Sequence, residues 1–566
     1  MILSAISLWK KFNLKNPLGA SEWGIEEKDG ARHSHVSFSG NAAPDGSVRV
    51  YARFGCPVGE GKKPCVLLLP DAGGMPDKEL MDYFIQKGYA VLMPDYSGKM
   101  ATDTDGVMRT IYPASLEYGN YEKARGLYSM KGLEADKTTW FEWTYVALYA
   151  VKYLKSREDI GNIGVVGIRK GGEIAWKVML SPDIKCGVPI NAAGWRSFLN
   201  IAKFGDNIAH DLSDDRHRYI AAVEAQSYAP YVKCPVLMLC ALRDAEFDCD
   251  RAYDTYSRIG SSDGNALAYS PESGACIGPK GLADMDLFLE RNLKGREIFI
   301  PDTLNISLKE KEEGLEITVD CDRQGILEEA GVFYAEADVK TRSTFREWRR
   351  VYKVDGSSVK DGKAVCTVKP FEGAKAVFAY AYARYINGFC MMSKITSKRL
   401  SKPNPNAVKS RMLFSGKEME SFGIAKHEEY SIGDIFLERE AIPKTVRGYG
   451  NIRGAYSMGG IRTYKISSPR YIPDENALLE FDVYSAETQQ LEVAIEVADA
   501  ERAKERYTCI VDVKGGGKWK RIILRAADFK GEISSMPLQN FFDGSALAFD
   551  CAGEEKEFAV TNILWL

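Results

Sequence analysis

Residues 164–175 have the composition and spacing of a strained turn that presents one side chain for catalysis. An apolar strand runs into the stretch Gly-Ile-Arg-Lys-Gly-Gly at residues 167–172, and a helix is expected from Gly171 onward. Glycines at these spacings permit a sharp strand-to-helix turn, which lifts the central side chain above a sheet. The central residue here is Arg169, whose guanidinium stays protonated and cannot attack a carbonyl carbon. The sequence therefore predicts the frame of a nucleophile turn without its nucleophile.

The elements around this turn alternate between strand and helix from residue 64 to about residue 294. Strands are predicted over residues 65–70, 89–94, 163–167, 186–191, 235–241 and 266–270. Helices are predicted over residues 77–87, 138–156 and 280–293, with a further one from residue 171. Repeated alternation of this kind indicates a doubly wound, mostly parallel α/β sheet covered by helices.

The pattern after residue 295 is different. Residues 303–398 alternate apolar and polar side chains with a period of two, as in residues 315–319 and 376–382. This is typical of an antiparallel sandwich such as the immunoglobulin-like fold. Residues 401–406 have linker composition, and the remainder is again rich in strands. We predict three domains: residues 1–298 (α/β, with an N-terminal extension), 299–400 (immunoglobulin-like sandwich) and 407–566 (jelly roll).

Residues from about 40 to 295 resemble the dienelactone hydrolase and acetyl xylan esterase branch of the α/β-hydrolases. Residues 69–74 stand where that family has its histidine-glycine-glycine oxyanion loop, and residues 234–244 match the strand that ends in the catalytic acid, here Asp244. Residues 269–278 match the loop of the catalytic histidine but carry Ala275 and Cys276 instead. The chain's histidines are His33, His35, His210, His217 and His427. Since none follows Asp244 within this region, the usual Ser-His-Asp reaction is not available.

Four carboxylates are candidates to gather around Arg169 at the carboxyl edge of the sheet. They are Asp71, Asp95, Glu173 and Asp244. Paired carboxylates there would suit acid–base chemistry, including glycoside cleavage. The interpretation we favour is instead an ion pair between Arg169 and Asp244 that fills the former site.

The same edge is a candidate ligand site. An arginine at a helix N-terminus, beside backbone N–H groups, suits a carboxylate or phosphate, and an aromatic face such as that of Trp195 suits a sugar ring. Trp143 is more simply explained as a core residue. The candidate ligand-binding residues are Arg169, Lys170, Gly73, Gly74, Trp195 and Asp95.

The C-terminal region resembles galactose-binding-like and carbohydrate-binding jelly rolls. The resemblance lies in residues 517–524, 528–529 and 558–565. Tyr449, Tyr456 and Tyr464 are candidates for stacking on sugars, whereas Trp519 is expected in the core. A purely structural role for this domain is the alternative.

Composition excludes several classes of function. The formal charge is −3, from 75 basic and 78 acidic residues, which leaves no electrostatic footprint for nucleic acid or an anionic membrane. Twelve cysteines without zinc-finger spacing indicate buried thiols in a reducing compartment, and no metal or cofactor is expected. Without the order of a signal peptide or a run of 18 apolar residues, we expect a cytoplasmic protein. The oligomeric state is left open.

These observations predict a degenerate esterase that does not hydrolyse and that binds a glycan or a small anionic ligand, or scaffolds a partner. The principal alternative is a carbohydrate-active hydrolase that uses carboxylates and Arg169 in the former esterase pocket. A third hypothesis is a residual esterase whose nucleophile is Ser97, Ser197 or Cys276.

Overall fold

The structure is a computed structural model of the chain. The residues it describes are 4–199, 201, 203–204, 213–244, 246–261, 263–271, 277–337, 348, 351–356, 359–371, 373–401, 409–417, 419, 422–424, 444–447, 451–457, 460–497, 505–554 and 556–566. Ala275, Cys276, His210, His427 and Tyr449 lie outside these ranges, as do residues 402–406 of the expected linker. No helix within the described ranges is both long and apolar enough to cross a membrane.

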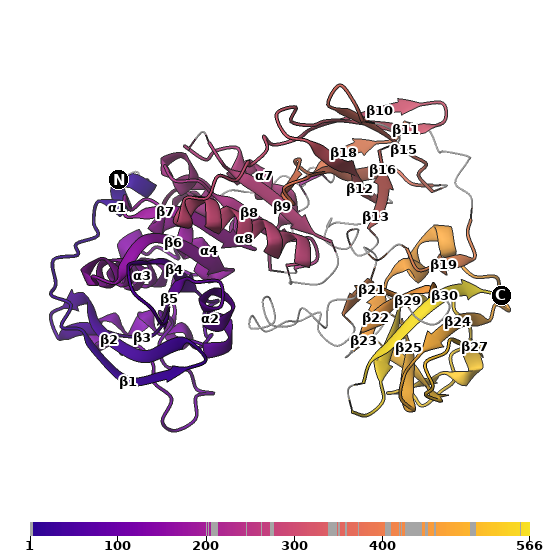
Figure 1. Cartoon of the computed structure of the whole chain (residues 1–566), viewed down its shortest axis with the longest axis horizontal. Helices are drawn as coiled ribbons and strands as arrows, with labels where there is room; N and C mark the ends of the chain where they lie inside the picture. Colours follow the sequence, from indigo (N-terminus) through magenta and orange to yellow (C-terminus); the bar gives the residue numbers. More distant parts are fainter. Residues whose placement is uncertain are drawn as a thin grey trace.

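The first sheet, as far as the chain is described, has nine strands in the order β1-β2-β3-β5-β4-β6-β7-β8-β9 (Figure 1). The strands are β1 (Ser21–Lys28), β2 (Ala31–Ala43), β3 (Gly46–Pro57), β4 (Lys63–Leu69), β5 (Ala90–Asp95), β6 (Ile160–Ile168), β7 (Ile184–Ile190), β8 (Leu237–Ala241) and β9 (Ala266–Ser270). From β5 to β9 neighbouring strands are parallel, and β1 to β3 add an antiparallel edge. The predicted α/β sheet is confirmed. The sequence did not predict the antiparallel edge. Its outermost strand, β1, is mostly exposed and rich in charged residues, so it lacks the apolar run that marks a buried strand.

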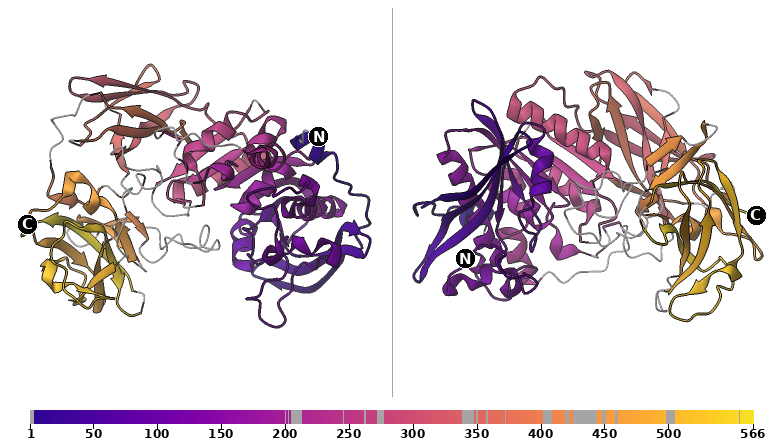
Figure 2. Two further views of the ribbon diagram at one scale, coloured as in Figure 1. Left: turned by 180° about the vertical axis from the view of Figure 1, so that it is seen from behind. Right: turned by 60° about the horizontal axis from the view of Figure 1, so that its bottom comes forward.

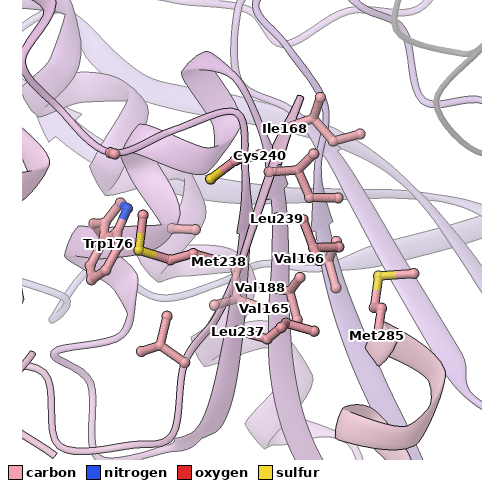
Figure 3. Packing of buried hydrophobic residues seen from close by; sticks show 14 of the residues in the cluster. Val165, Val166, Ile168, Trp176, Val188, Leu237, Met238, Leu239, Cys240 and Met285 are labelled. Carbon is pink, nitrogen blue, oxygen red and sulfur yellow. The ribbon is translucent and has the colours of Figure 1, made fainter. Parts of the chain in front are cut away.

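Helices cover both faces of this sheet. On one face, α2 (Lys78–Ile85) and α8 (Pro279–Lys294) lie together, and Tyr83 donates a hydrogen bond to Asp286. On the other, α3 (Thr139–Ser156) packs against α4 (Lys170–Val178). Figure 3 shows Trp176 of α4 and Met285 of α8 on opposite sides of strands β6, β7 and β8. Strands buried on both faces need apolar residues at consecutive positions, which is the pattern that predicted them. The other α-helices in the described part of the chain are α1 (Ala5–Trp9), α5 (Asp214–Ala222), α6 (Ala225–Tyr228) and α7 (Cys249–Tyr256).

Glu142 of α3 is a buried carboxylate that should make the stability of this domain depend on pH. It accepts hydrogen bonds from Asn41 and Tyr118, and burial raises its pKa to about 6. Between the pH at which an unfolded glutamate ionises and about pH 6, the folded state therefore holds a proton that the unfolded chain has lost. The free energy of unfolding should fall by about 2 kcal/mol as pH rises through this window.

The check is to measure unfolding of the wild type and Glu142→Gln by denaturant from pH 4 to pH 7.5. We expect the curve of the variant to be flatter than the wild-type curve by about 2 kcal/mol over that window. The control is Glu79→Gln, on the exposed side of α2, which should reproduce the wild-type slope. Parallel curves for the wild type and Glu142→Gln would show that folding does not perturb this carboxyl.

Two antiparallel sheets follow the α/β domain, with strand orders β10-β11-β15-β14 and β13-β12-β16-β17, and β18 also pairs with β16. Their strands are β10 (Asn305–Lys311), β11 (Gly314–Asp320), β12 (Leu327–Ala337), β13 (Tyr352–Asp355), β14 (Val359–Lys360), β15 (Lys363–Val368), β16 (Ala376–Tyr385), β17 (Cys390–Met392) and β18 (Thr396–Arg399). The buried residues of these sheets form one continuous core with those of the α/β domain. At the junction, Cys390 donates its backbone N–H to Asp284 of α8.

The C-terminal strands form two more antiparallel sheets, β21-β22-β30-β24-β27, with β19 also on β30, and β20-β23-β29-β25-β26-β28. Their strands are β19 (Met412–Phe414), β20 (Phe422–Ile424), β21 (Lys444–Arg447), β22 (Arg453–Ser457), β23 (Gly460–Thr463), β24 (Leu479–Tyr484), β25 (Gln489–Val497), β26 (Glu505–Val513), β27 (Lys520–Leu524), β28 (Lys530–Gly531), β29 (Gly544–Cys551) and β30 (Phe558–Trp565). Phe481 and Phe549 meet between the two sheets, with ring centroids 5.0 Å apart. The predicted all-β C-terminal architecture is thus confirmed.

The C-terminal sheets have a hydrophobic core of their own and contact the middle sheets through an ion pair. Arg470 donates hydrogen bonds to both carboxylate oxygens of the buried Glu336 of β12. Figures 1 and 2 show the middle sheets between the α/β domain and the C-terminal sheets. The exact domain boundaries stay predictions.

Candidate functional site: the closed elbow

Arg169 has the backbone conformation of a nucleophile elbow. It links β6 to α4 with φ 46° and ψ −111°, a strained region for a residue with a side chain. Its N–H donates to the carbonyl of Ile190, 2.8 Å away, which ties the turn to β7. The tight turn is possible because Gly171 lets α4 approach the carbonyl oxygens of Leu69 and Pro70. The turn therefore has the backbone geometry of a nucleophile elbow with an arginine at its centre.

The Arg169 side chain forms a bidentate ion pair with Asp244, as the sequence predicted. Its Nε lies 3.0 Å from Asp244 Oδ2 and its Nη2 lies 3.1 Å from Oδ1. The Asp244 side chain is 0% exposed and that of Arg169 is 13% exposed. Burial raises the pKa of Asp244, and Arg169 opposes the shift. Both oxygens of the Asp244 carboxylate are therefore already hydrogen-bonded to Arg169.

Asp71 fills the place where an oxyanion would be stabilised. In α/β-hydrolases the oxyanion hole combines the backbone N–H after the nucleophile with an N–H from the loop that follows the third strand of the fold, here β4. In this chain those donors are Lys170 N and Ala72 N, and both donate to Asp71 Oδ1, at 3.1 and 2.9 Å. One carboxylate oxygen of the protein itself thus takes both hydrogen bonds that would stabilise a transition state.

The charges of this cluster balance one another. Lys170 Nζ lies 3.6 Å from Asp71 and 3.5 Å from Glu246, and Arg169 Nη1 lies 3.9 Å from Asp71. Burial disfavours the charged form of Lys170, but the two carboxylates outweigh it and raise its pKa. Burial likewise opposes ionisation of Glu246, and Lys170 and Arg169 nevertheless lower the pKa of that carboxyl. Arg169 and Lys170 are thus both paired with carboxylates of the protein, and neither is free to bind a ligand anion.

Asp95 and the two glycines of the oxyanion loop serve that loop's structure. Asp95 is fully buried, accepts hydrogen bonds from Ser97, Gly98 and Thr110, and has a pKa that burial raises to about 6. Gly73 donates its N–H to Ser97 Oγ, and Arg109 donates to the carbonyls of Gly73 and Gly74. These contacts lock the loop that carries Asp71. Among the described residues, Asp95 forms no hydrogen bond or ion pair with Arg169.

Glu173 and Trp195 have hydrogen-bond partners other than Arg169 and Asp244. Glu173 is buried and accepts the N–H of Gly194 at 2.8 Å. Trp195 donates its indole N–H to Thr255 of α7, and the guanidinium of Arg258 lies over its ring. The structure therefore brings Asp71 and Asp244 to Arg169, and places Glu173 and Trp195 beside the neighbouring loop.

The remaining candidate residues make contacts that stabilise the fold. Trp143 is buried and donates to Gly119 O, as expected for a core residue. Ser97 and Ser197 donate to Asp95 and Glu224, and no histidine contacts either hydroxyl among the residues described. Tyr456 is bonded to Glu557, Tyr464 is buried and Trp519 is half-buried. The described residues contain no group of three histidine, cysteine, aspartate or glutamate side chains placed to hold a metal ion.

Sequence reasoning missed three residues around the elbow: Glu246, Arg109 and Arg196. Glu246 follows Asp244 by two positions, so the end of a strand that carries a catalytic acid was a usable signal for it. Arg109 and Arg196 lie in loops without a motif, and only the folded chain brings them to the oxyanion loop and to Glu173.

The strand order and the elbow define the class of the first domain, which has an α/β-hydrolase fold. Residues 50–263 match the model of the dienelactone hydrolase family, which confirms the resemblance seen in the sequence. The match covers the sheet from β3 to β8 and includes Arg169 and Asp244. A comparison with curated proteins found no match.

Solved structures of esterases are similar to part of the chain. An acetyl xylan esterase from Paenibacillus sp. R4 is 16% identical, covers 51% of this chain and 92% of its own, and has a TM-score of 0.39. Acetyl xylan esterase 1 from Thermoanaerobacterium sp. JW/SL YS485 is 16% identical, with coverages of 50% and 91% and a TM-score of 0.38. Est1E from Butyrivibrio proteoclasticus, with ferulic acid bound, is 16% identical, with coverages of 44% and 95% and a TM-score of 0.30.

Proposed function

We propose that this chain is a non-hydrolytic relative of the esterase-type α/β-hydrolases, and that it binds a carbohydrate-type ligand without cleaving it. The observation that carries the proposal is Asp71 Oδ1, which accepts both backbone N–H groups of the former oxyanion hole. A substrate carbonyl could enter only by displacing a carboxylate that is also 3.6 Å from Lys170. The carbohydrate part rests on the sequence resemblance of the first and last domains to carbohydrate-directed proteins.

The closed elbow argues against the alternative of acid–base chemistry in the same pocket. A general acid or base must reach the proton that it transfers. Asp244 has both oxygens bonded to Arg169 and one also to the N–H of Glu246, and its side chain is 0% exposed. Asp71 accepts the backbone N–H groups of Lys170 and Ala72 through one oxygen, Oδ1. The hypothesis of a residual esterase is weakened for Ser97 and Ser197, because each donates to a carboxylate with no histidine beside it in the described structure.

The test is hydrolysis of 4-nitrophenyl acetate by the wild type and by two designed variants. The first, Arg169→Ser/Ala275→His, restores the missing triad residues. The second adds Asp71→Ala, which frees the two N–H donors. We expect no turnover by the wild type, weak turnover by the first variant and about 10²-fold more by the second, because an oxyanion-hole donor is worth that much.

Asp71→Ala alone is the control, since it opens the hole without supplying a nucleophile and should stay inactive. A serine-directed phosphonate should label both designed variants and leave the wild type unlabelled. Wild-type turnover that persists in Asp71→Ala and Asp244→Asn would contradict the proposal and direct attention to another site.

A further inference from the structure

Arg196 differs from Arg169, Lys170 and Arg109 in forming no ion pair with a carboxylate of the described residues, although the charges of Glu173 and Asp71 raise its pKa. Arg169 and Lys170 face carboxylates, and Arg109 pairs with Asp103. Lys177 donates to a backbone carbonyl. The half-buried Arg196 makes no hydrogen bond or ion pair from its guanidinium to any described residue, and its Nε is buried without a partner. A buried donor left without an acceptor is unfavourable, so a group that accepts from it gains that free energy.

The backbone that carries Arg196 is held firmly. Arg196 begins a short 3-10 turn, Arg196–Phe198, directly after Trp195 in a left-handed conformation with φ 59°. The N–H groups of Gly194, Trp195 and Ser197 donate to Glu173, Gln226 and Glu224 at 2.8, 3.1 and 2.8 Å. Three side chains on two helices and a loop thus position the turn from which the Arg196 side chain extends.

An exposed aromatic ring lies against this guanidinium. Arg196 Cζ is 5.2 Å from the centroid of the Tyr128 ring, and Tyr128 is 53% exposed. The same region contains Lys170, whose Nζ is 5.7 Å from the centroid of Tyr121. The loop of Arg196 is tied to α4, the helix that follows the elbow, by the hydrogen bond from Gly194 N–H to Glu173, so Arg196 borders the elbow. Free donors and an aromatic face therefore adjoin at the edge of the former active site.

We propose that Arg196 and Tyr128 bind a ligand that carries a carboxylate on a ring. A guanidinium matches a carboxylate through two parallel hydrogen bonds, and the face of a tyrosine packs on a sugar or aromatic ring. Asp71 and Glu173 raise the pKa of Arg196, and Arg196 lowers that of Glu246, so negative charge already lies nearby and a singly charged group is favoured over a doubly charged phosphate. A uronic acid and an aromatic acid share this chemistry. The inference rests on the proposed function, for which it names the ligand class.

The experiment measures binding of four probes to the full chain by ligand-observed NMR: glucuronate, benzoate, glucose and inorganic phosphate. We expect saturable binding of at least one of the carboxylates, and weaker or no binding of glucose and phosphate. Glucuronate alone would identify an acidic sugar as the source, and benzoate alone an aromatic acid. Equal binding of glucose and glucuronate, or no binding of either carboxylate, would overturn the proposal.

Variants assign the binding to this site. Arg196→Gln removes the paired donors and should weaken binding at least about 10-fold, while Arg196→Lys keeps the charge and should lose less. Tyr128→Leu should weaken binding of the ring. The matched control is Arg258→Gln, whose exposed guanidinium also stacks on an aromatic ring and should have no effect. Unchanged thermal unfolding of Arg196→Gln would confirm that folding is intact. Binding that survives this substitution would contradict the assignment of the ligand site to Arg196.

The two proposals can fail separately. Hydrolysis of 4-nitrophenyl acetate is measured on the same samples. Turnover by the wild type with Arg196-dependent binding would refute the non-hydrolytic function and leave the carboxylate site standing. Absence of turnover together with no Arg196-dependent binding would leave the non-hydrolytic function standing and refute the carboxylate site.

Discussion

Replacing Arg169 by methionine is expected to lower the free energy of unfolding by about 3–5 kcal/mol at neutral pH, because it leaves the Asp244 carboxylate buried without its cation. Both oxygens of Asp244 bond to Arg169, and its side chain is 0% exposed. Burial already raises the pKa of Asp244, and without Arg169 the pKa should rise further. The loss should therefore be smaller at pH 5, where the carboxyl can take up a proton, and larger at pH 8.

Denaturant unfolding at the two pH values checks this expectation. The control is the double variant Arg169→Met/Asp244→Leu, which removes both charges. We expect it to recover most of the lost stability, since an apolar pair of similar size often replaces a buried ion pair without loss. If Arg169→Met costs less than about 1 kcal/mol at pH 8, the pair behaves as a solvated surface contact and the elbow is not closed.

Gly171→Ala should prevent the elbow from forming. A Cβ at this position would lie 2.2 Å from the carbonyl oxygens of both Leu69 and Pro70. These are backbone atoms at the end of a central strand, so relief of the clash would require β4 and α4 to separate. We expect a loss of at least about 4 kcal/mol, which lies among the largest effects of single substitutions. The measurement is the yield of folded protein and its thermal unfolding.

Gly161→Ala is the matched control for this variant. Gly161 lies in β6, a few residues before the elbow, and the nearest atom to its Cβ would be the carbonyl oxygen of Lys63 at 3.5 Å. That is an ordinary contact, and an alanine there should leave stability within about 1 kcal/mol of the wild type. A Gly171→Ala protein that unfolds like Gly161→Ala would contradict the close approach of α4 to β4.

The sequence determined the elements that position the site. Runs of apolar residues specified the parallel strands β4 to β9, because strands buried on both faces cannot carry polar side chains. Glycines around Arg169 specified the turn, and the order of strands indicated that the ends of β6 and β8 lie near each other. The pairing of Arg169 with Asp244 follows from these local facts. The lack of a serine at position 169 and of a histidine between Asp244 and Leu293 is read directly from the sequence.

The tertiary structure alone decided where loop side chains point. Asp71, Asp95 and Glu173 were equivalent candidates by sequence, and their partners separate them: Asp71 takes the N–H of Lys170, Asp95 that of Thr110 and Glu173 that of Gly194. Each of these partners is 15 or more positions away in the chain. A loop side chain is oriented by whichever distant donor the fold brings to it, and no local pattern encodes that donor. The same reason hid Arg196, whose environment exists only once the chain has folded.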